Sequence, residues 1–141
     1  MFAIPQIIAA LVIGVCYYML AVAMTVYDGL FSLIFQPLIG AIYSGIAIFI
    51  LLILGLPIRL SSRINGWWRR HWWIPIAIGT VAFIVMCSSW HPYFRVRVMD
   101  PELDMMVDSL NPVLSIFGWL LTLFAVLHFY PQFPQLKRPT K

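Results

Sequence analysis

Residues 59–75 read RLSSRINGWWRRHWWIP and lie between two long apolar segments. This connector holds four of the nine basic residues of the chain and four of its six tryptophans. Arg and Lys beside apolar segments are typical of the cytoplasmic loops of membrane proteins, and Trp is enriched at the membrane–water interface. The connector therefore suggests that the apolar segments on either side of it cross a membrane.

Composition supports this interpretation. The chain has 141 residues, of which 62% are hydrophobic and only 10% are charged, whereas soluble domains contain about 25% charged residues. The mean hydropathy of +0.93 leaves too few polar residues to cover a soluble surface. At about 20 residues per spanning helix, the chain has room for four spans with short connectors and no separate soluble domain.

Four segments lack Asp, Glu, Lys and Arg and are long enough to span a bilayer, where a backbone must satisfy its own hydrogen bonds as a helix. The second such segment contains Pro37, which we expect to divide it, with LFSLIFQ before it forming an outer interfacial turn or a kinked arm. The expected fold class is an all-α integral membrane protein, a single four-span antiparallel transmembrane helix bundle with a short amphipathic outer helix between spans three and four. The predicted spans are residues 4–26, 37–57, 72–90 and 112–130.

Charge sets the expected orientation. With four spans, the loop 58–71 and the tail 131–141 share one side, which carries seven of the nine basic residues and no acid. The other side, including the loop 91–111, carries all five acids and two arginines. The positive-inside rule then places both termini in the cytoplasm. We expect a multi-pass protein of the bacterial inner (plasma) membrane.

The Arg and Trp residues of the connector are predicted to anchor the protein at the membrane interface, where each basic residue contributes about 1 kcal/mol of attraction to anionic lipid. The alternative is a recognition patch for a cytoplasmic partner or a nucleic acid. Membrane anchoring already accounts for the cluster, so no nucleic-acid partner is expected. The predicted anchors are Arg59, Arg63, Trp67, Trp68, Arg69, Arg70, Trp72 and Trp73.

Small residues recur four positions apart in the first two spans, and this spacing lets helices pack closely in lipid. The pattern predicts packing of span one against span two, and the alternative is an interface between copies of the chain. The residues concerned are Ala10, Gly14, Gly40, Ala41, Ser44 and Gly45.

The outer loop 91–111 contains two local patterns. YFRVRVM alternates in polarity and predicts an extended segment, whereas DPELDMMVDSLNP predicts a short helix with Asp100 as its N-cap and Pro101 in its first turn. Four apolar residues then fall on one helical face. We expect this face and the preceding arginines to bind a partner through Arg95, Arg97, Leu103, Met106, Val107 and Leu110.

The spans contain no acidic or basic side chain besides histidine, which argues against an ion-coupled transporter and against acid–base catalysis within the membrane. The sequence has no nucleophile–base pair, phosphate-binding loop or metal-ligand cluster. No enzyme activity, cofactor or metal is therefore expected. A haem between His71 and His128, or a cation on the acids of the outer loop, is an alternative that no recognisable ligand spacing supports.

Three functions fit these features. The first is a small membrane protein that acts without catalysis through partner proteins, as an accessory or assembly subunit or as an immunity-type inhibitor. The second is a homo-oligomeric pore-forming or membrane-perturbing effector, and the third is a small membrane-anchor subunit of a redox complex. The expected partners are the lipid bilayer and either another membrane protein or a second copy of the chain.

Overall fold

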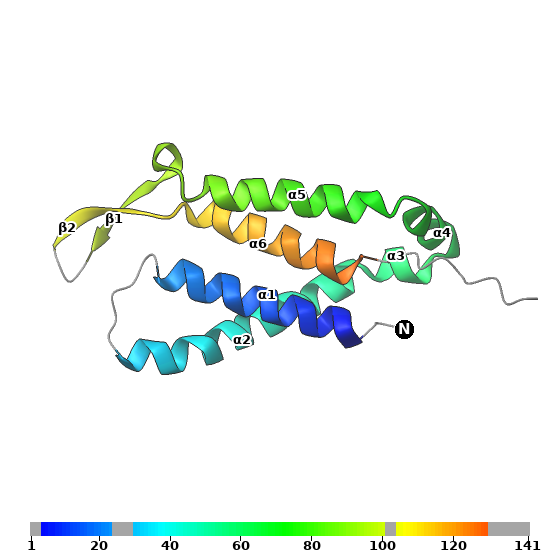
Figure 1. The fold of residues 1–141 in the computed structure, drawn as a ribbon, viewed down its shortest axis with the longest axis horizontal. Coiled ribbons are helices and arrows are strands. Elements are labelled where there is room, and N and C mark those ends of the chain that lie inside the picture. Colours follow the sequence, from blue (N-terminus) through cyan, green and yellow to red (C-terminus); the bar gives the residue numbers. More distant parts are fainter. Residues whose placement is uncertain (1–3, 24–29, 101–103, 130–141) are drawn as a thin grey trace, which may run out of the picture.

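The computed structural model describes residues 4–23, 30–100 and 104–129, and this part of the chain is mostly helical (Figure 1). Six helices, one 3-10 turn and two strands follow one another along the described chain. In order they are α1 (Ile4–Ala23), α2 (Leu30–Leu54), α3 (Leu56–Leu60), α4 (Ser62–Arg70), α5 (Trp73–Ser88), the turn η1 (Pro92–Phe94), β1 (Val96–Asp100), β2 (Met105–Ser109) and α6 (Pro112–Leu127).

Two of the helices are long and apolar enough to cross a membrane. The segments concerned are Ile4–Val22 of α1 and Ile34–Leu54 of α2. Helices α4 and α5 meet this criterion only as a pair, with a bend of 72° between them, and α6 is a shorter apolar helix. The described chain thus contains two candidate membrane spans, or three if α4 and α5 form one bent span.

The expected division of the second apolar segment at Pro37 does not occur, since α2 runs without a break from Leu30 to Leu54. Proline removes one backbone hydrogen bond and its ring crowds the preceding turn. Helices in apolar surroundings tolerate this loss through local adjustment, because any non-helical alternative would leave several more backbone groups unsatisfied. The arm 30–36 is therefore the first part of α2.

Helix α6 occupies the centre of the helical assembly and contacts α5, α1 and α2 (Figure 1). Helix α1 also packs along α2, and α5 is held mainly by α6. A core of buried side chains from α1, α2 and α6 fills the space between these three helices. Its members are Ala10, Ala47, Ile48, Leu51, Leu123 and Leu127.

Helix α6 approaches the backbone of α5 closely at Gly118. A Cβ atom at Gly118 would lie 2.9 Å from the backbone nitrogen of Met86 and 3.0 Å from the carbonyl oxygen of Ala82. Both neighbouring atoms belong to the backbone of α5, so only glycine permits this spacing. The contact lets α5, which has few other partners, pack firmly on α6.

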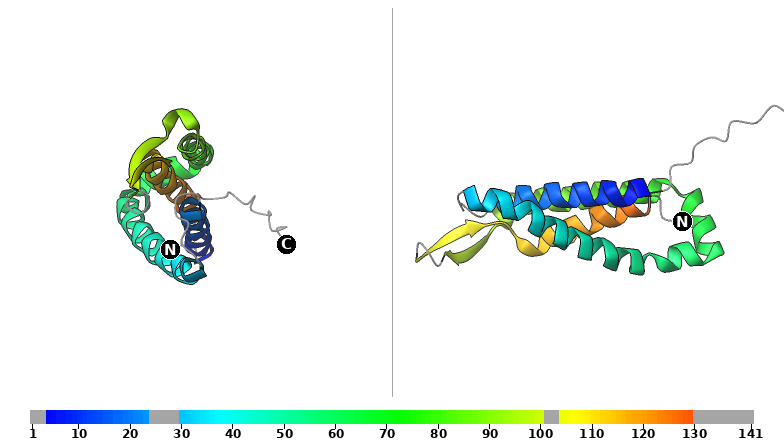
Figure 2. Two further views of the ribbon diagram at one scale, coloured as in Figure 1. Left: turned by 90° about the vertical axis from the view of Figure 1, so that its left-hand side faces the viewer. Right: turned by 90° about the horizontal axis from the view of Figure 1, so that it is seen from below.

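The expected outer helix is wrong, because the described residues of this loop include two paired strands, β1 and β2, which form a β-hairpin. Strands β1 and β2 pair antiparallel, with Val98 opposite Val107 and Met99 opposite Met106. Asp104 lies in the turn with a φ of 49°, a conformation that Asp tolerates better than most residues. The hairpin extends beyond the helices at one end of the molecule, and α3 and α4 lie at the opposite end (Figure 2). These ends are named the hairpin end and the connector end below.

Candidate functional site

The β-hairpin presents apolar side chains on both of its faces. Met99 and Met106 form a cross-strand pair on one face and are 57% and 61% exposed. On the same face, Arg97 Nε lies 3.7 Å from Asp108 Oδ1, in a pair that is itself largely exposed. The opposite face carries the exposed side chains of Val98 and Met105. Such a hairpin is only marginally stable alone in water, and the exposed pair of methionines is suited to an apolar partner.

The residues predicted to bind a partner do not share one surface. Met106 and Val107 are adjacent on β2, so their side chains point to opposite faces of the hairpin. Arg95 ends the turn η1, and Leu110 is half-buried beside the start of α6. Leu103 lies outside the described residues. The surface that does exist joins Arg97 to Met106, together with Met99, which sequence reasoning missed.

At the connector end, α4 docks onto the last turn of α6. The indole nitrogen of Trp68 donates a hydrogen bond of 2.9 Å to the carbonyl oxygen of His128, and its ring meets the Phe124 ring edge-on. Arg59 donates through Nη2 to the carbonyl oxygen of Leu127 at 3.0 Å. The last carbonyls of a helix have no partner within the helix. Two distant side chains therefore cap the C-terminus of α6.

His128 is fully buried at this junction. Its ring stacks on Phe124, its Nδ1 lies 3.0 Å from the Phe124 carbonyl oxygen, and the ring packs directly over Gly55, where any Cβ would overlap it. Its Nε2 makes no hydrogen bond within the described residues. His71 is engaged elsewhere, with its Nδ1 2.9 Å from the carbonyl oxygen of Trp67.

The predicted interface anchors divide into two groups. Trp68 departs from the prediction, since it is 8% exposed and packs on α6 rather than facing lipid. Arg59 likewise points inward to the end of α6. The others present exposed side chains around the amphipathic helix α4 and the start of α5, namely Arg63, Trp67, Arg69, Arg70, Trp72 and Trp73.

The small residues of the first two helices also form two groups, those that pack against a neighbouring helix and those that do not. Ala10 and Ser44 are fully buried, and a Cβ at Gly14 would lie 2.6 Å from Ser44 Oγ, so these positions bring α1 and α2 together. Gly40 lies against the ring of Tyr18, 2.7 Å from the position of a Cβ. Gly45 has no neighbour within 4 Å of a Cβ and takes no part in packing within the described chain. Ala41 is half-buried.

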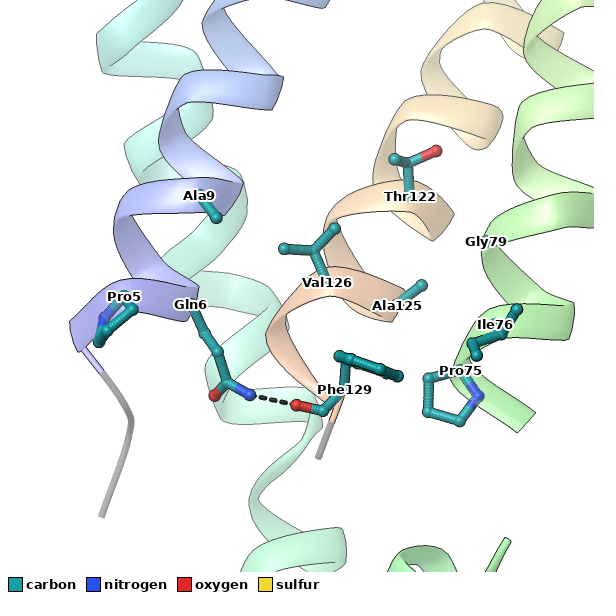
Figure 3. A pocket seen from close by; sticks show the side chains of 10 residues that line it. All are labelled: Pro5, Gln6, Ala9, Pro75, Ile76, Gly79, Thr122, Ala125, Val126 and Phe129. Carbon is teal, nitrogen blue, oxygen red and sulfur yellow. Dashed lines mark hydrogen bonds between the residues drawn. The ribbon is translucent and has the colours of Figure 1, made fainter. Parts of the chain in front are cut away.

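A groove of about 430 Å³ lies between α1 and α5 at the connector end, with α6 as its floor (Figure 3). We call it the lateral groove. Its polar side chains are already bonded within the protein, because Gln6 donates to the Phe129 carbonyl oxygen and Thr122 donates to the Gly118 carbonyl oxygen at 2.8 Å. The lining consists of Pro5, Gln6, Ala9, Pro75, Ile76, Gly79, Thr122, Ala125, Val126 and Phe129.

Sequence reasoning missed the lateral groove, the His128 junction and the contact of Gly118. The groove is lined from three helices that are far apart in the sequence, and none of its residues follows a binding motif. Gly55 and Gly118 were visible as glycines in or beside apolar segments, which signals a close approach without naming the neighbour. Among the described residues, no group of three His, Cys, Asp or Glu side chains could hold a metal ion.

The arrangement thus offers two surfaces of different character: an exposed Met pair at the hairpin end and an apolar groove at the connector end. Comparison with family models, with curated proteins and with solved structures finds no match for this chain.

Proposed function

We propose that this chain is a four-span membrane protein that acts without catalysis, by binding a partner membrane protein through its β-hairpin. The observation that carries the proposal is the exposed cross-strand pair of Met99 and Met106. Methionine is flexible and polarizable, and it is over-represented on surfaces that adapt to protein partners. Such a protein is an accessory or assembly subunit, or an immunity-type inhibitor of a membrane-acting toxin.

Four crossings are supported by how the long helices lie. Helices α5 and α6 run side by side with α1 and α2 between the two ends of the molecule (Figure 1). Helices α5 and α6 have 16 residues each. This corresponds to about 24 Å of helix at 1.5 Å per residue, which is shorter than a hydrocarbon core of about 30 Å. Trp72 and Trp73 lie at the start of α5 and Trp90 lies just after its end, so they suit the two interfaces and make up part of the difference.

In this topology, the connector end faces the cytoplasm and the hairpin lies outside. The connector carries Arg59, Arg63, Arg69 and Arg70 with no acidic residue, whereas the hairpin carries both signs of charge. The Arg97–Asp108 pair borders the methionines. Charges at the border of an apolar contact contribute more to orientation and partner choice than to affinity. The hairpin therefore has the make-up of a small recognition surface.

The test is native mass spectrometry of the protein extracted from its own membrane in mild detergent. The wild-type chain is expected in a complex with a different membrane protein. Met106→Asp places an unpaired charge in the contact and should release the partner, while the amount of chain in the membrane stays unchanged. The matched control is Val98→Asp, which adds the same charge to the opposite face of the hairpin and should leave the complex intact.

Three outcomes would count against the proposal. A wild-type chain that runs alone has no such partner. A homogeneous assembly of the chain with itself favours the pore-forming alternative. Equal loss of the complex in Met106→Asp and Val98→Asp would mean that the hairpin as a whole, and not its Met face, is needed.

A further inference from the structure

We infer that the lateral groove holds one acyl chain of an anionic phospholipid, whose head group lies against the basic residues of α4. This site is separate from the hairpin, at the opposite end of the molecule, and does not depend on the hairpin's having a partner. Three observations carry the inference: the size of the groove, the chemistry of its lining and the charge of the chain segment that leads into its α5 wall.

The size of the groove favours an acyl chain over a helix of another protein. The groove extends from Thr122 of α6 to Phe129, just beyond the end of that helix. These positions span about 10 Å, and a helix about 10 Å in diameter would fill on the order of 800 Å³ over that length. The groove offers about 430 Å³. That volume lies within the range of about 300–1,000 Å³ typical of small-ligand sites.

The lining favours an apolar ligand. Burying a polar group costs free energy unless it finds a hydrogen-bond partner, and the two polar side chains of the lining, Gln6 and Thr122, are already bonded to backbone carbonyls. Figure 3 shows the proline, alanine and isoleucine side chains around them, with the open space between α1 and the start of α5. A polar ligand would leave its own groups unsatisfied there, whereas a hydrocarbon chain would not.

The charge of the segment that leads into the α5 wall of the groove favours an anionic head group. The groove lies beside the first turns of α1 and α5 and the last turns of α6, at the end of the molecule that carries α4. Arg70 is exposed and lies five residues before Pro75 of the groove. Residues 56–79 contain four arginines and no acid. Basic residues beside a membrane attract anionic phospholipids over zwitterionic ones.

The inference is tested by reconstituting the full chain in vesicles of equimolar phosphatidylglycerol and phosphatidylcholine, followed by extraction and native mass spectrometry. The wild-type chain should retain one phospholipid, with phosphatidylglycerol preferred about tenfold, which corresponds to about 1.4 kcal/mol. Gly79→Phe should abolish retention by filling the groove. Gly45→Phe is the matched control, because a side chain at Gly45 meets open space on α2.

Two further variants sharpen the result. Ala9→Phe fills the groove from α1, so it decides the question if Gly79→Phe does not fold. Arg70→Gln should reduce the preference for phosphatidylglycerol, whereas Arg63→Gln, two turns earlier on α4, should reduce it less.

Four results would overturn the inference: no retained lipid in the wild type, equal retention in Ala9→Phe and Gly45→Phe, no preference for phosphatidylglycerol, or equal effects of Arg70→Gln and Arg63→Gln. A rise in retained lipid after deletion of residues 131–141 would assign the groove to the chain's own tail and would overturn it as well.

Discussion

At the scale of single residues, the indole of Trp68 carries the contact between α4 and the end of α6. Its N–H is the donor to the His128 carbonyl oxygen, and its ring rests against Phe124. The acceptor is one of the helix-terminal carbonyls that no residue of α6 can reach. Loss of the donor leaves that carbonyl buried and unsatisfied, which costs more than the bond itself contributes.

Trp68→Phe is therefore expected to lower the free energy of unfolding by about 1–3 kcal/mol, because it keeps an aromatic ring and removes only the N–H donor. The measurement is unfolding of the purified chain in a series of detergent mixtures, followed by circular dichroism. Trp67→Phe is the control, since Trp67 is 52% exposed, and it should change stability little. Equal destabilisation by the two variants would show that the indole donor is not what holds α4.

The contrast between Trp67 and Trp68 also marks the limit of local patterns. Both residues lie in the same Arg/Trp-rich connector, and an interfacial location suits either one. Only the position of α6, more than forty residues later in the chain, decides that Trp68 turns inward. Arg59 is a similar case, since its acceptor on Leu127 also comes from α6. Sequence reasoning could identify the anchors as a class but could not sort them individually.

At the scale of helices, Gly40 and Gly45 separate packing within the chain from packing between chains. A side chain at Gly40 would push into the ring of Tyr18, whose hydroxyl donates to Gln36 Oε1 at 2.8 Å. Gly40→Leu should therefore destabilise the pairing of α1 with α2, and Gly45→Leu should not. Cysteine crosslinking between α1 and α2 measures this pairing. Dissociation of a self-assembled complex by Gly45→Leu would instead show that this position contacts a second copy.

A second helix-scale prediction concerns the pair α5 and α6. Gly118→Ala forces a methyl group against the backbone of α5, and overpacking of this kind costs about 1–3 kcal/mol. Gly79→Ala is the control at the same interface, because its Cβ would lie at an ordinary 3.6 Å from the Ala125 Cβ. Thermal unfolding should show a lower transition temperature for Gly118→Ala alone. Similar transition temperatures for the two variants would contradict the close contact.

The hairpin shows why one element escaped prediction. Its second strand contains apolar residues at spacings that also fit a helix, and Asp100-Pro101 is a common helix start. The stabilising contacts of a hairpin join residues of two strands, here Met99 with Met106 and Arg97 with Asp108. A search for periodicity within one segment cannot register such pairs. The alternation before Asp100 did predict an extended segment, and residues 96–100 are strand β1.

At the scale of the whole molecule, composition predicted the class of fold but did not predict which helix lies at its centre. The lack of charge in long segments predicted membrane-spanning helices, and two helices have the length and apolar character to cross a membrane. Which helix lies at the centre was not predictable, because α6 is neither the longest nor the most conspicuous apolar segment. Its central position results from contacts with three other helices, and such contacts have no local signature. The lateral groove follows from the same arrangement.

The topology can be tested at three positions in the chain. Four crossings place residue 65 of α4 and the C-terminal residue Lys141 on the cytoplasmic side, and Asp104 of the hairpin turn on the other. We expect a reporter that is active only outside the cytoplasm to work at Asp104 and to fail at the other two positions. The physical reason is the charge distribution, since the connector and the tail carry seven basic residues and no acid.

The alternative topologies give different patterns of reporter activity. If α5 and α6 entered the membrane and returned without crossing, the hairpin would stay on the side of α4 and a reporter at Asp104 would be inactive. If α6 alone failed to cross, the reporter would be active at both Asp104 and Lys141. In that case the C-terminal tail would lie on the outer side together with the hairpin, and either could meet a partner there. Because α5 and α6 extend alongside α1 and α2 from one end of the molecule to the other (Figure 1), we expect a membrane that is crossed by the first pair to be crossed by the second pair as well.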